Sequence, residues 1–159
     1  MRRLFVVLLL VLVMPALLWA AGASVTQTIN PIKTRTGDVV GIEYTLTCTG
    51  DSVTGAISDT DFTSGLQDEI EGMYLYRMIV TNTTTQADVT DDSDIYIKTD
   101  LGNDLLNGAG VDRLDKDAEN YVRLTYYPII ADDMGTLYLD VDNNSGASSV
   151  YTITLIFIY

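Results

Sequence analysis

Apolar and polar side chains alternate with a period of two along most of this 159-residue chain. The clearest case is residues 39–49, where Ile42, Tyr44 and Leu46 alternate with polar side chains. Successive side chains of a β-strand point to opposite faces, so this pattern is typical of a half-buried strand. Cys48 falls on the apolar side of the alternation and is predicted to be a small core residue.

Seven other segments are predicted to be strands. The first ends at Pro31 and is expected at a sheet edge, because proline cannot donate a backbone hydrogen bond. The last two flank a turn at residues 143–147 and are predicted to pair as a hairpin. The final segment is apolar and uncharged, so it is expected to be central in a sheet or paired with another subunit. These segments are residues 24–30, 52–58, 73–81, 95–99, 119–127, 135–142 and 150–159.

One segment departs from the period of two. Phe62, Leu66 and Ile70 recur at every fourth position, which predicts a short helix over residues 61–71 that Gly72 ends. Short strands with regular turns and one brief helix indicate an all-β chain. We expect an antiparallel β-sandwich or jelly-roll-like single domain.

Residues 1–23 have the layout of a signal peptide. Two arginines precede an apolar run that Pro15 interrupts, and Ala21-Gly22-Ala23 matches the small-x-small pattern that signal peptidase reads. Cleavage after Ala23 leaves residues 24–159 as one domain, exported to the periplasm, the cell surface or the medium. Cleavage after Ala20 is the second choice, and an uncleaved membrane anchor is the alternative.

The composition excludes several classes of function. The chain has no histidine and one cysteine, which excludes histidine-dependent nucleophilic catalysis, ordinary zinc sites and an internal disulfide. Its net charge is −13, and loss of Arg2 and Arg3 with the leader makes it −15. Nucleic-acid binding depends on lysine and arginine, so we expect none. Hydrolysis by a pair of carboxylates stays the least favoured hypothesis, and we predict that the chain is not an enzyme.

A glycine-rich segment follows the predicted strand at residues 95–99. Its pattern is G-x-D-x-L-x-G-x-G-x-x-R, carried by Gly102, Asp104, Leu106, Gly108, Gly110 and Arg113. From Met73 onward the chain resembles small β-rich structural and accessory proteins of tailed bacteriophages. The resemblance implies a non-enzymatic component of a virus particle. Because particles are assembled in the cytoplasm, the leader instead favours a prophage-encoded surface protein or a cellular protein that shares the fold.

The same segment is predicted to be a rigid connector, with glycines supplying backbone angles closed to other residues. Leu105 and Leu106 are expected to hold it against the core, and Arg113 to pair with Asp104 or Asp112. A phosphate-binding loop is disfavoured, because no lysine follows the last glycine.

The candidate metal is calcium, because Asp140, Asp142 and Asn144 have the D-x-D-x-N spacing that opens a loop of oxygen ligands. An EF-hand loop then requires glycine and glutamate where this chain has Ser145 and Tyr151, so a solvated strand face is the favoured interpretation. No other cofactor is expected. A second acidic cluster, also more typical of a solvated loop, comprises Asp88, Asp91, Asp92 and Asp94.

Two hypotheses lead. The first is a non-enzymatic phage-type structural, decoration or surface protein that acts through packing and self-association, with copies of itself or other virion or surface proteins as partners. The second is an exported cell-surface or periplasmic binding module for glycans or cations, favoured by the leader and the acidic charge. Membrane contact is expected only through an uncleaved leader.

Overall fold

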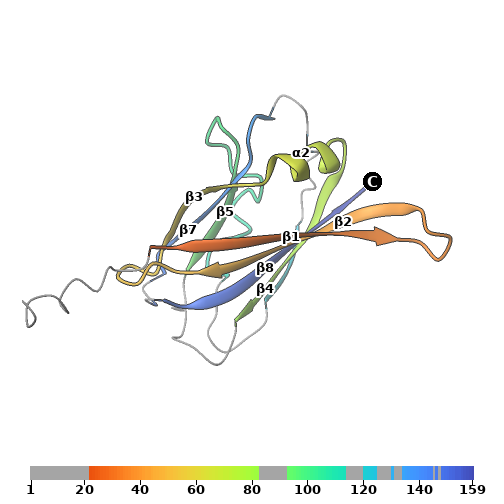
Figure 1. Ribbon diagram of the computed structural model, residues 1–159. Helices are drawn as coiled ribbons and strands as arrows, with labels where there is room; N and C mark the ends of the chain where they lie inside the picture. Colours follow the sequence, from red (N-terminus) through yellow and green to blue (C-terminus); the bar gives the residue numbers. More distant parts are fainter. Residues whose placement is uncertain are drawn as a thin grey trace, which may run out of the picture.

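The computed structural model describes residues 22–82, 93–113, 120–124, 130, 134–144, 146 and 148–159. The predicted leader lies almost wholly outside these residues. Within them the chain forms eight strands in two antiparallel sheets and one short helix (Figure 1). The predicted all-β fold with a single brief helix is therefore confirmed.

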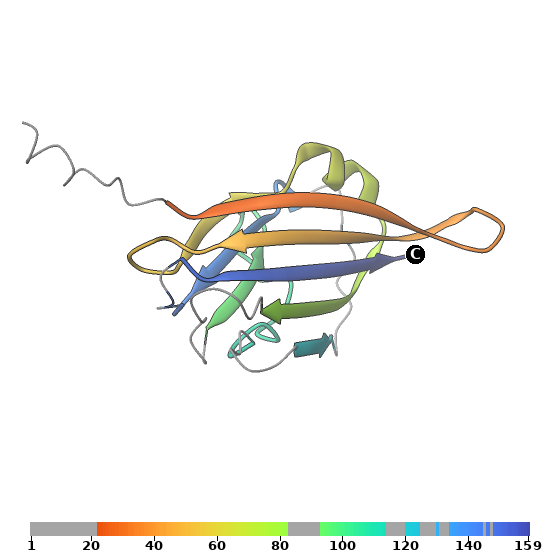
Figure 2. The same ribbon diagram turned by 60° about the horizontal axis from the view of Figure 1, so that its bottom comes forward.

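The larger sheet has five strands, and Figure 2 looks onto it with β1 at the upper border. Its central strand is β8, paired with β2 on one side and β4 on the other. The expectation that the last segment is central is confirmed. In spatial order the strands are β1 (Ser24–Lys33), β2 (Val39–Thr49), β8 (Val150–Ile158), β4 (Tyr74–Asn82) and β6 (Asn120–Arg123).

The smaller sheet has three strands and lies behind the larger one in Figure 2. Its order is β3 (Ile57–Asp61), β7 (Tyr138–Asp142) and β5 (Asp94–Lys98). The helix α2 (Ser64–Ile70) connects β3 of this sheet to β4 of the other.

One hydrophobic core fills the space between the sheets. Every second residue of a strand points into this core. In β2 these residues are Tyr44, Leu46 and Cys48, which are fully buried. The smaller sheet contributes residues such as Ile97 and Leu139 to the same core. This is the sandwich arrangement, and the prediction that Cys48 is a core residue is confirmed.

The helix is shorter than predicted. It begins at Ser64, and Phe62 lies before it, buried and packed edge-on against Tyr44 with ring centroids 4.9 Å apart. Leu66 and Ile70 are buried on the inner face as expected. Thr63, which follows Phe62, has the extended backbone angles φ −60° and ψ 136°, so the apolar spacing continues but the helical backbone starts only after Thr63.

The strand predicted over residues 52–58 is wrong in position. Residues 52–54 form a turn, and β3 begins only at Ile57. The Asp51 carboxylate accepts hydrogen bonds from the amides of Val53 and Thr54, at 2.8 and 2.9 Å. These bonds favour a local turn over a strand and hold the pKa of Asp51 below its usual value.

The first strand is longer than predicted. It continues through Pro31 to Lys33, with Pro31 opposite Ile42 of β2. Proline is compatible with an edge strand, because a missing N–H on the outer side costs no ladder hydrogen bond. The edge position itself is confirmed.

The predicted hairpin between the last two strands is also wrong. β7 pairs with β3 and β5, whereas β8 pairs with β2 and β4. The chain crosses between the sheets after β7, and Asn144 is buried at the crossing. Its side-chain amide donates to the carbonyl of Gly55 and to the Ser149 hydroxyl, at 3.0 and 2.9 Å. The bond to Gly55 spans 89 residues and ties the crossing to the segment before β3, where a hairpin would have only a local turn.

β4 is an inner strand of its sheet, as its two apolar faces predict. A bulge between Leu75 and Arg77 interrupts the alternation, so that Leu75 and Met78 are both fully buried.

Candidate functional site

The glycine-rich connector lies along the outer edge of β5. Asp104 forms an isolated antiparallel bridge with Lys98, and residues 105–112 form a run of turns along the side of β5 opposite β7. Three backbone hydrogen bonds join it to this edge: Leu105 N–H to Ile97 O at 2.7 Å, Ile95 N–H to Gly110 O at 2.9 Å, and Arg113 N–H to Ser93 O at 3.1 Å. The connector therefore covers an edge that would otherwise be open to another strand.

Asp104 organises the connector from within. One carboxylate oxygen accepts the amide of Leu106 at 3.0 Å, and the other accepts the amide of Gly108 at 2.9 Å. Leu105 and Leu106 are buried in the core, as expected. The connector is thus held by the charged hydrogen-bond acceptor Asp104 and by the burial of Leu105 and Leu106.

The glycines of the connector have two different physical roles. Gly102 and Gly108 have φ of +76° and +77°, the left-handed conformation that glycine adopts most readily. Gly110 does not, so the expectation of a special backbone angle is wrong there. A Cβ at Gly110 would overlap the carbonyl oxygen of Ile95 and crowd Leu106, so this position needs glycine for space.

The predicted ion pair of Arg113 with Asp104 or Asp112 stays a prediction. The Nε of Arg113 donates to the carbonyl of Ala109 at 3.0 Å, within the connector.

Asp94 ties the connector to the crossing after β7, a role that sequence reasoning missed. It is buried, and its carboxylate accepts the amide of Asp112 at 3.0 Å and the side-chain amide of Asn143 at 2.6 Å. Asn143 has a positive φ of 60°, a conformation that asparagine tolerates better than most residues. Sequence reasoning placed Asp94 in an acidic cluster whose other members, Asp88, Asp91 and Asp92, lie outside the described residues.

Of the three residues proposed to bind calcium, Asp140 and Asn144 have protein partners. Asp140 is buried and forms an ion pair with Lys98, whose pKa is raised chiefly by the hydrogen bond to Asp140. The oxygen of the Asn144 amide accepts the amide of Gly146 at 3.0 Å, while Asp142 is exposed. Over the described residues, no three His, Cys, Asp or Glu side chains are grouped to hold a metal ion. Calcium binding here stays a prediction.

The outer face of the five-stranded sheet carries an ordered array of threonines, which we call the threonine face. Strand register aligns them in two rows, each crossing β1, β2 and β8. They are exposed or half-buried, since the residues that alternate with them point into the core. The rows are Thr26, Thr47 and Thr152, and Thr28, Thr45 and Thr154, and they continue on β4 to Thr81 and Ile79.

β1 is the long open edge of the molecule. It has ten residues, whereas the strands at the other ends of the sheets, β3, β5 and β6, have five, five and four. The edge of β5 is covered by the connector. Among the residues that the structure describes, no backbone hydrogen bond reaches the outer side of β1. Sequence reasoning found the edge strand, but not that it would be the longest uncovered one.

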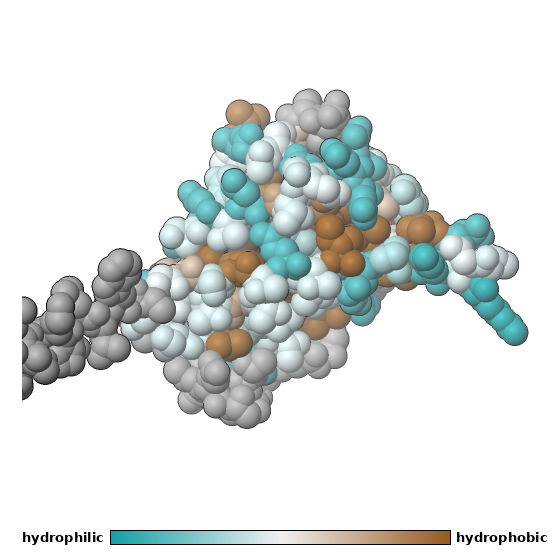
Figure 3. All heavy atoms as spheres, in the orientation of Figure 1, coloured by the Kyte–Doolittle hydropathy of each residue, from teal (hydrophilic) through white to brown (hydrophobic). Residues whose placement is uncertain are grey.

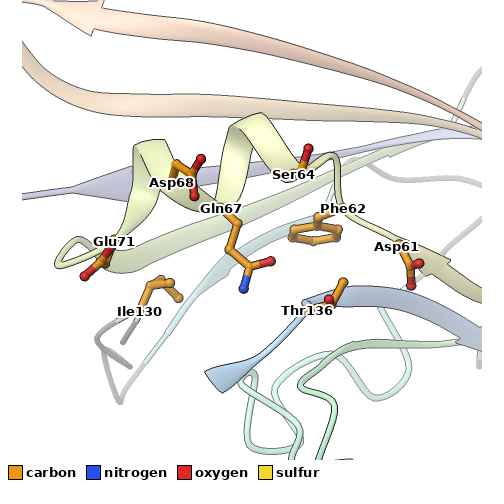
Figure 4. Close-up of a pocket in the computed structure, with 8 residues that line it drawn as sticks. All are labelled: Asp61, Phe62, Ser64, Gln67, Asp68, Glu71, Ile130 and Thr136. Atoms are coloured by element: carbon orange, nitrogen blue, oxygen red, sulfur yellow. The ribbon is translucent and has the colours of Figure 1, made fainter. Parts of the chain in front are cut away.

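Two hollows lie between α2 and its surroundings. The first has a volume of about 350 Å³, with Phe62 and Ile130 at its apolar side and the carboxylates of Asp61, Asp68 and Glu71 around it (Figure 4). The second is an apolar groove of about 590 Å³ at the base of the β1–β2 hairpin, where hydrophobic surface gathers in Figure 3. It is lined by Ile29, Pro31, Val39, Ile42, Met73 and Tyr159, with Lys33, Asp68 and Glu69 beside them.

None of the helices in the described part of the chain is long and apolar enough to cross a membrane. Comparison with known proteins gives no matching family model, no matching curated protein and no matching solved structure.

Proposed function

We propose that this chain is an exported, non-enzymatic structural or accessory protein of the phage type, which acts through packing and self-association. The observation that carries the proposal is the threonine face. Its two rows across four strands contain no charged residue, although the chain has 22 acidic residues and a net charge of −13.

Copies of a strongly acidic protein repel one another unless their contact surfaces are free of like charge. The two uncharged threonine rows remove this obstacle over their own area, while Glu43 and Arg77 lie in the next row of the same face. The β-branched side chains of the rows pack well on pleated surfaces. The connector supports the same function, because its backbone bonds to β5 close that edge of the opposite sheet. A domain with one closed edge and two uncharged threonine rows is suited to a repeated place in a particle or on a surface.

Export is part of the proposal. β1 begins at Ser24, so cleavage after Ala23 would remove the leader and leave every described strand complete. After this cleavage the edge strand β1 would begin at the new N-terminal residue, Ser24.

The second candidate is an exported binding module for glycans or cations. The hollow beside α2 favours it, because its space of about 350 Å³ is lined by the exposed acidic residues Asp61, Asp68 and Glu71 and by the ring of Phe62. Such a site would recognise a cation or a basic group through charge.

The experiment is to fractionate a producing culture into density-purified particles, periplasm, envelope and medium, and to locate the protein and its mature N-terminus by mass spectrometry. The proposal expects an assembled protein beginning near Ser24 at the cell surface, or a stoichiometric component of particles. A monomeric protein confined to the periplasm or medium would refute it and favour the binding module.

A further inference from the structure

We infer that two copies of this chain pair through their β1 edges, antiparallel about a two-fold axis at Gln27. The inference rests on the proposed function, since it names the partner and the surface of self-association. The result is one continuous sheet built from the two five-stranded sheets.

The edges of the two sheets differ in how they are protected. Natural proteins protect sheet edges by shortness, by covering them or by charge. Here β3 and β6 are short and the connector covers β5, whereas β1 is long and has no backbone partner on its outer side among the described residues. Residues 24–30 of β1 contain no charge, proline or glycine, and Pro31 follows them. Proline, one of the residues that discourage pairing at a sheet edge, therefore occurs only after residue 30.

The stretch Ser-Val-Thr-Gln-Thr-Ile-Asn is nearly symmetric in residue type around Gln27, with threonine on both sides, then valine and isoleucine, then serine and asparagine. An antiparallel pair of identical strands centred on Gln27 places Thr26 opposite Thr28 of the second copy and Val25 opposite its Ile29. Thr–Thr pairs and pairs of β-branched residues directly opposite one another stabilise antiparallel ladders. This symmetry selects a second copy as the partner over an unrelated strand.

The β1 edge is already held in place in the single copy. The Gln27 side chain accepts the amide of Thr63 at 3.0 Å and donates to the carbonyl of Asp61 at 2.8 Å, and the Tyr44 hydroxyl also bonds to it. Val25 and Ile29 pack against the core. Little conformational entropy is lost when a strand held in this way accepts a partner.

Pairing about this axis keeps the outer faces of the two sheets on the same side. The threonine rows then continue from one copy into the other through Thr26 and Thr28, which doubles the neutral face. The edge makes the dimer, and the face remains available for packing against other molecules.

The test uses sedimentation equilibrium of the processed protein and two matched variants. The double variant Thr26→Lys and Thr28→Lys places like charges opposite one another across the dimer contact. The control, Thr45→Lys and Thr47→Lys, makes the same charge change in the same two rows, but on the inner strand β2. We expect a wild-type dimer, a dissociation constant raised at least about tenfold in the β1 variant, and no change in the β2 variant.

Other outcomes separate this inference from the proposed function. Dissociation by both variants equally would place the contact on the threonine face, which overturns the edge pairing but keeps self-association. If both variants remain dimers, the dimer contact lies elsewhere on the molecule, and the edge pairing is also overturned. A monomeric wild type at high concentration would overturn both proposals.

Hydrogen exchange on the wild type keeps the inference testable if the β1 variant fails to fold. Within residues 24–30, the amides that point away from β2 should gain protection as the protein concentration rises. Protection that does not change with concentration, in a sample that dimerises, would overturn the edge pairing.

Discussion

The backbones of Ile95 and Gly110 meet without a side chain between them. The Ile95 amide donates to the Gly110 carbonyl at 2.9 Å, and the Ile95 carbonyl oxygen occupies the space where a Cβ of residue 110 would stand. This close approach allows the connector to serve in place of a further strand beside β5. It also explains why β1, and not β5, is the edge that remains open.

Replacing Gly110 should therefore be more damaging than replacing Gly108. Gly110→Ala drives a methyl group into the Ile95 carbonyl and should cost about 2–4 kcal/mol of unfolding free energy. Gly108→Ala meets no atom within 4 Å and pays only for its positive φ, about 1 kcal/mol. Urea denaturation measures both. Equal losses would show that the contact with Ile95 does not matter.

Asp104→Ala should loosen the connector. It removes the acceptors of the Leu106 and Gly108 amides, and we expect a loss of about 1–2 kcal/mol in thermal or urea unfolding. Asn103→Ala, at an exposed neighbouring side chain, is the control and should change stability little. A stability of Asp104→Ala equal to that of the control would contradict the organising role of the carboxylate.

Asp94→Ala tests the tie between the connector and the crossing after β7. The change leaves the Asp112 amide and the Asn143 side chain without their buried acceptor, which should cost about 2–3 kcal/mol. Asp142→Ala removes an exposed carboxylate close by and should be nearly neutral. If melting temperatures of the two variants match, Asp94 is not a structural tie.

Stability should fall in alkali. Burial raises the pKa of Tyr44 to about 12, so the unfolded phenol ionises near pH 10 while the folded one stays neutral. The contribution of Tyr44 to the unfolding free energy is complete below pH 10. About 2–3 kcal/mol of it is lost as the pH rises toward 12. The raised pKa of Lys98 acts in the same direction, since its ion pair with Asp140 disappears when the amine deprotonates.

The check is the unfolding free energy of wild type and Tyr44→Phe between pH 9 and pH 12, a range set by the tyrosine pKa values. The variant should show a shallower fall over this range. Tyr159→Phe, at an exposed tyrosine, should follow the wild type. An unchanged slope in Tyr44→Phe would mean that this phenol does not control the alkaline limb.

Local patterns were sufficient where a single strand face decides the outcome. The alternation over residues 39–49 predicts β2 at its observed limits and Cys48 in the core. The same reasoning failed where a side chain bonds to nearby backbone, as Asp51 does before β3. It also could not find Asp94 as a tie, because its partners Asp112 and Asn143 lie 18 and 49 residues away.

The sequence by itself determined most of the strand segments and which of their faces turn inward, because a period of two is a local property of an extended backbone. Only the tertiary structure decided which sheet each strand joins. β7 and β8 look like a hairpin in the sequence, yet they lie in different sheets. Alternation specifies a face but not a neighbour, and neighbours are chosen by hydrogen bonds and packing between distant residues. Pro31 predicted that the first strand lies at an edge, but only the fold showed that the connector covers the edge of β5 while the edge of β1 has no backbone partner among the described residues.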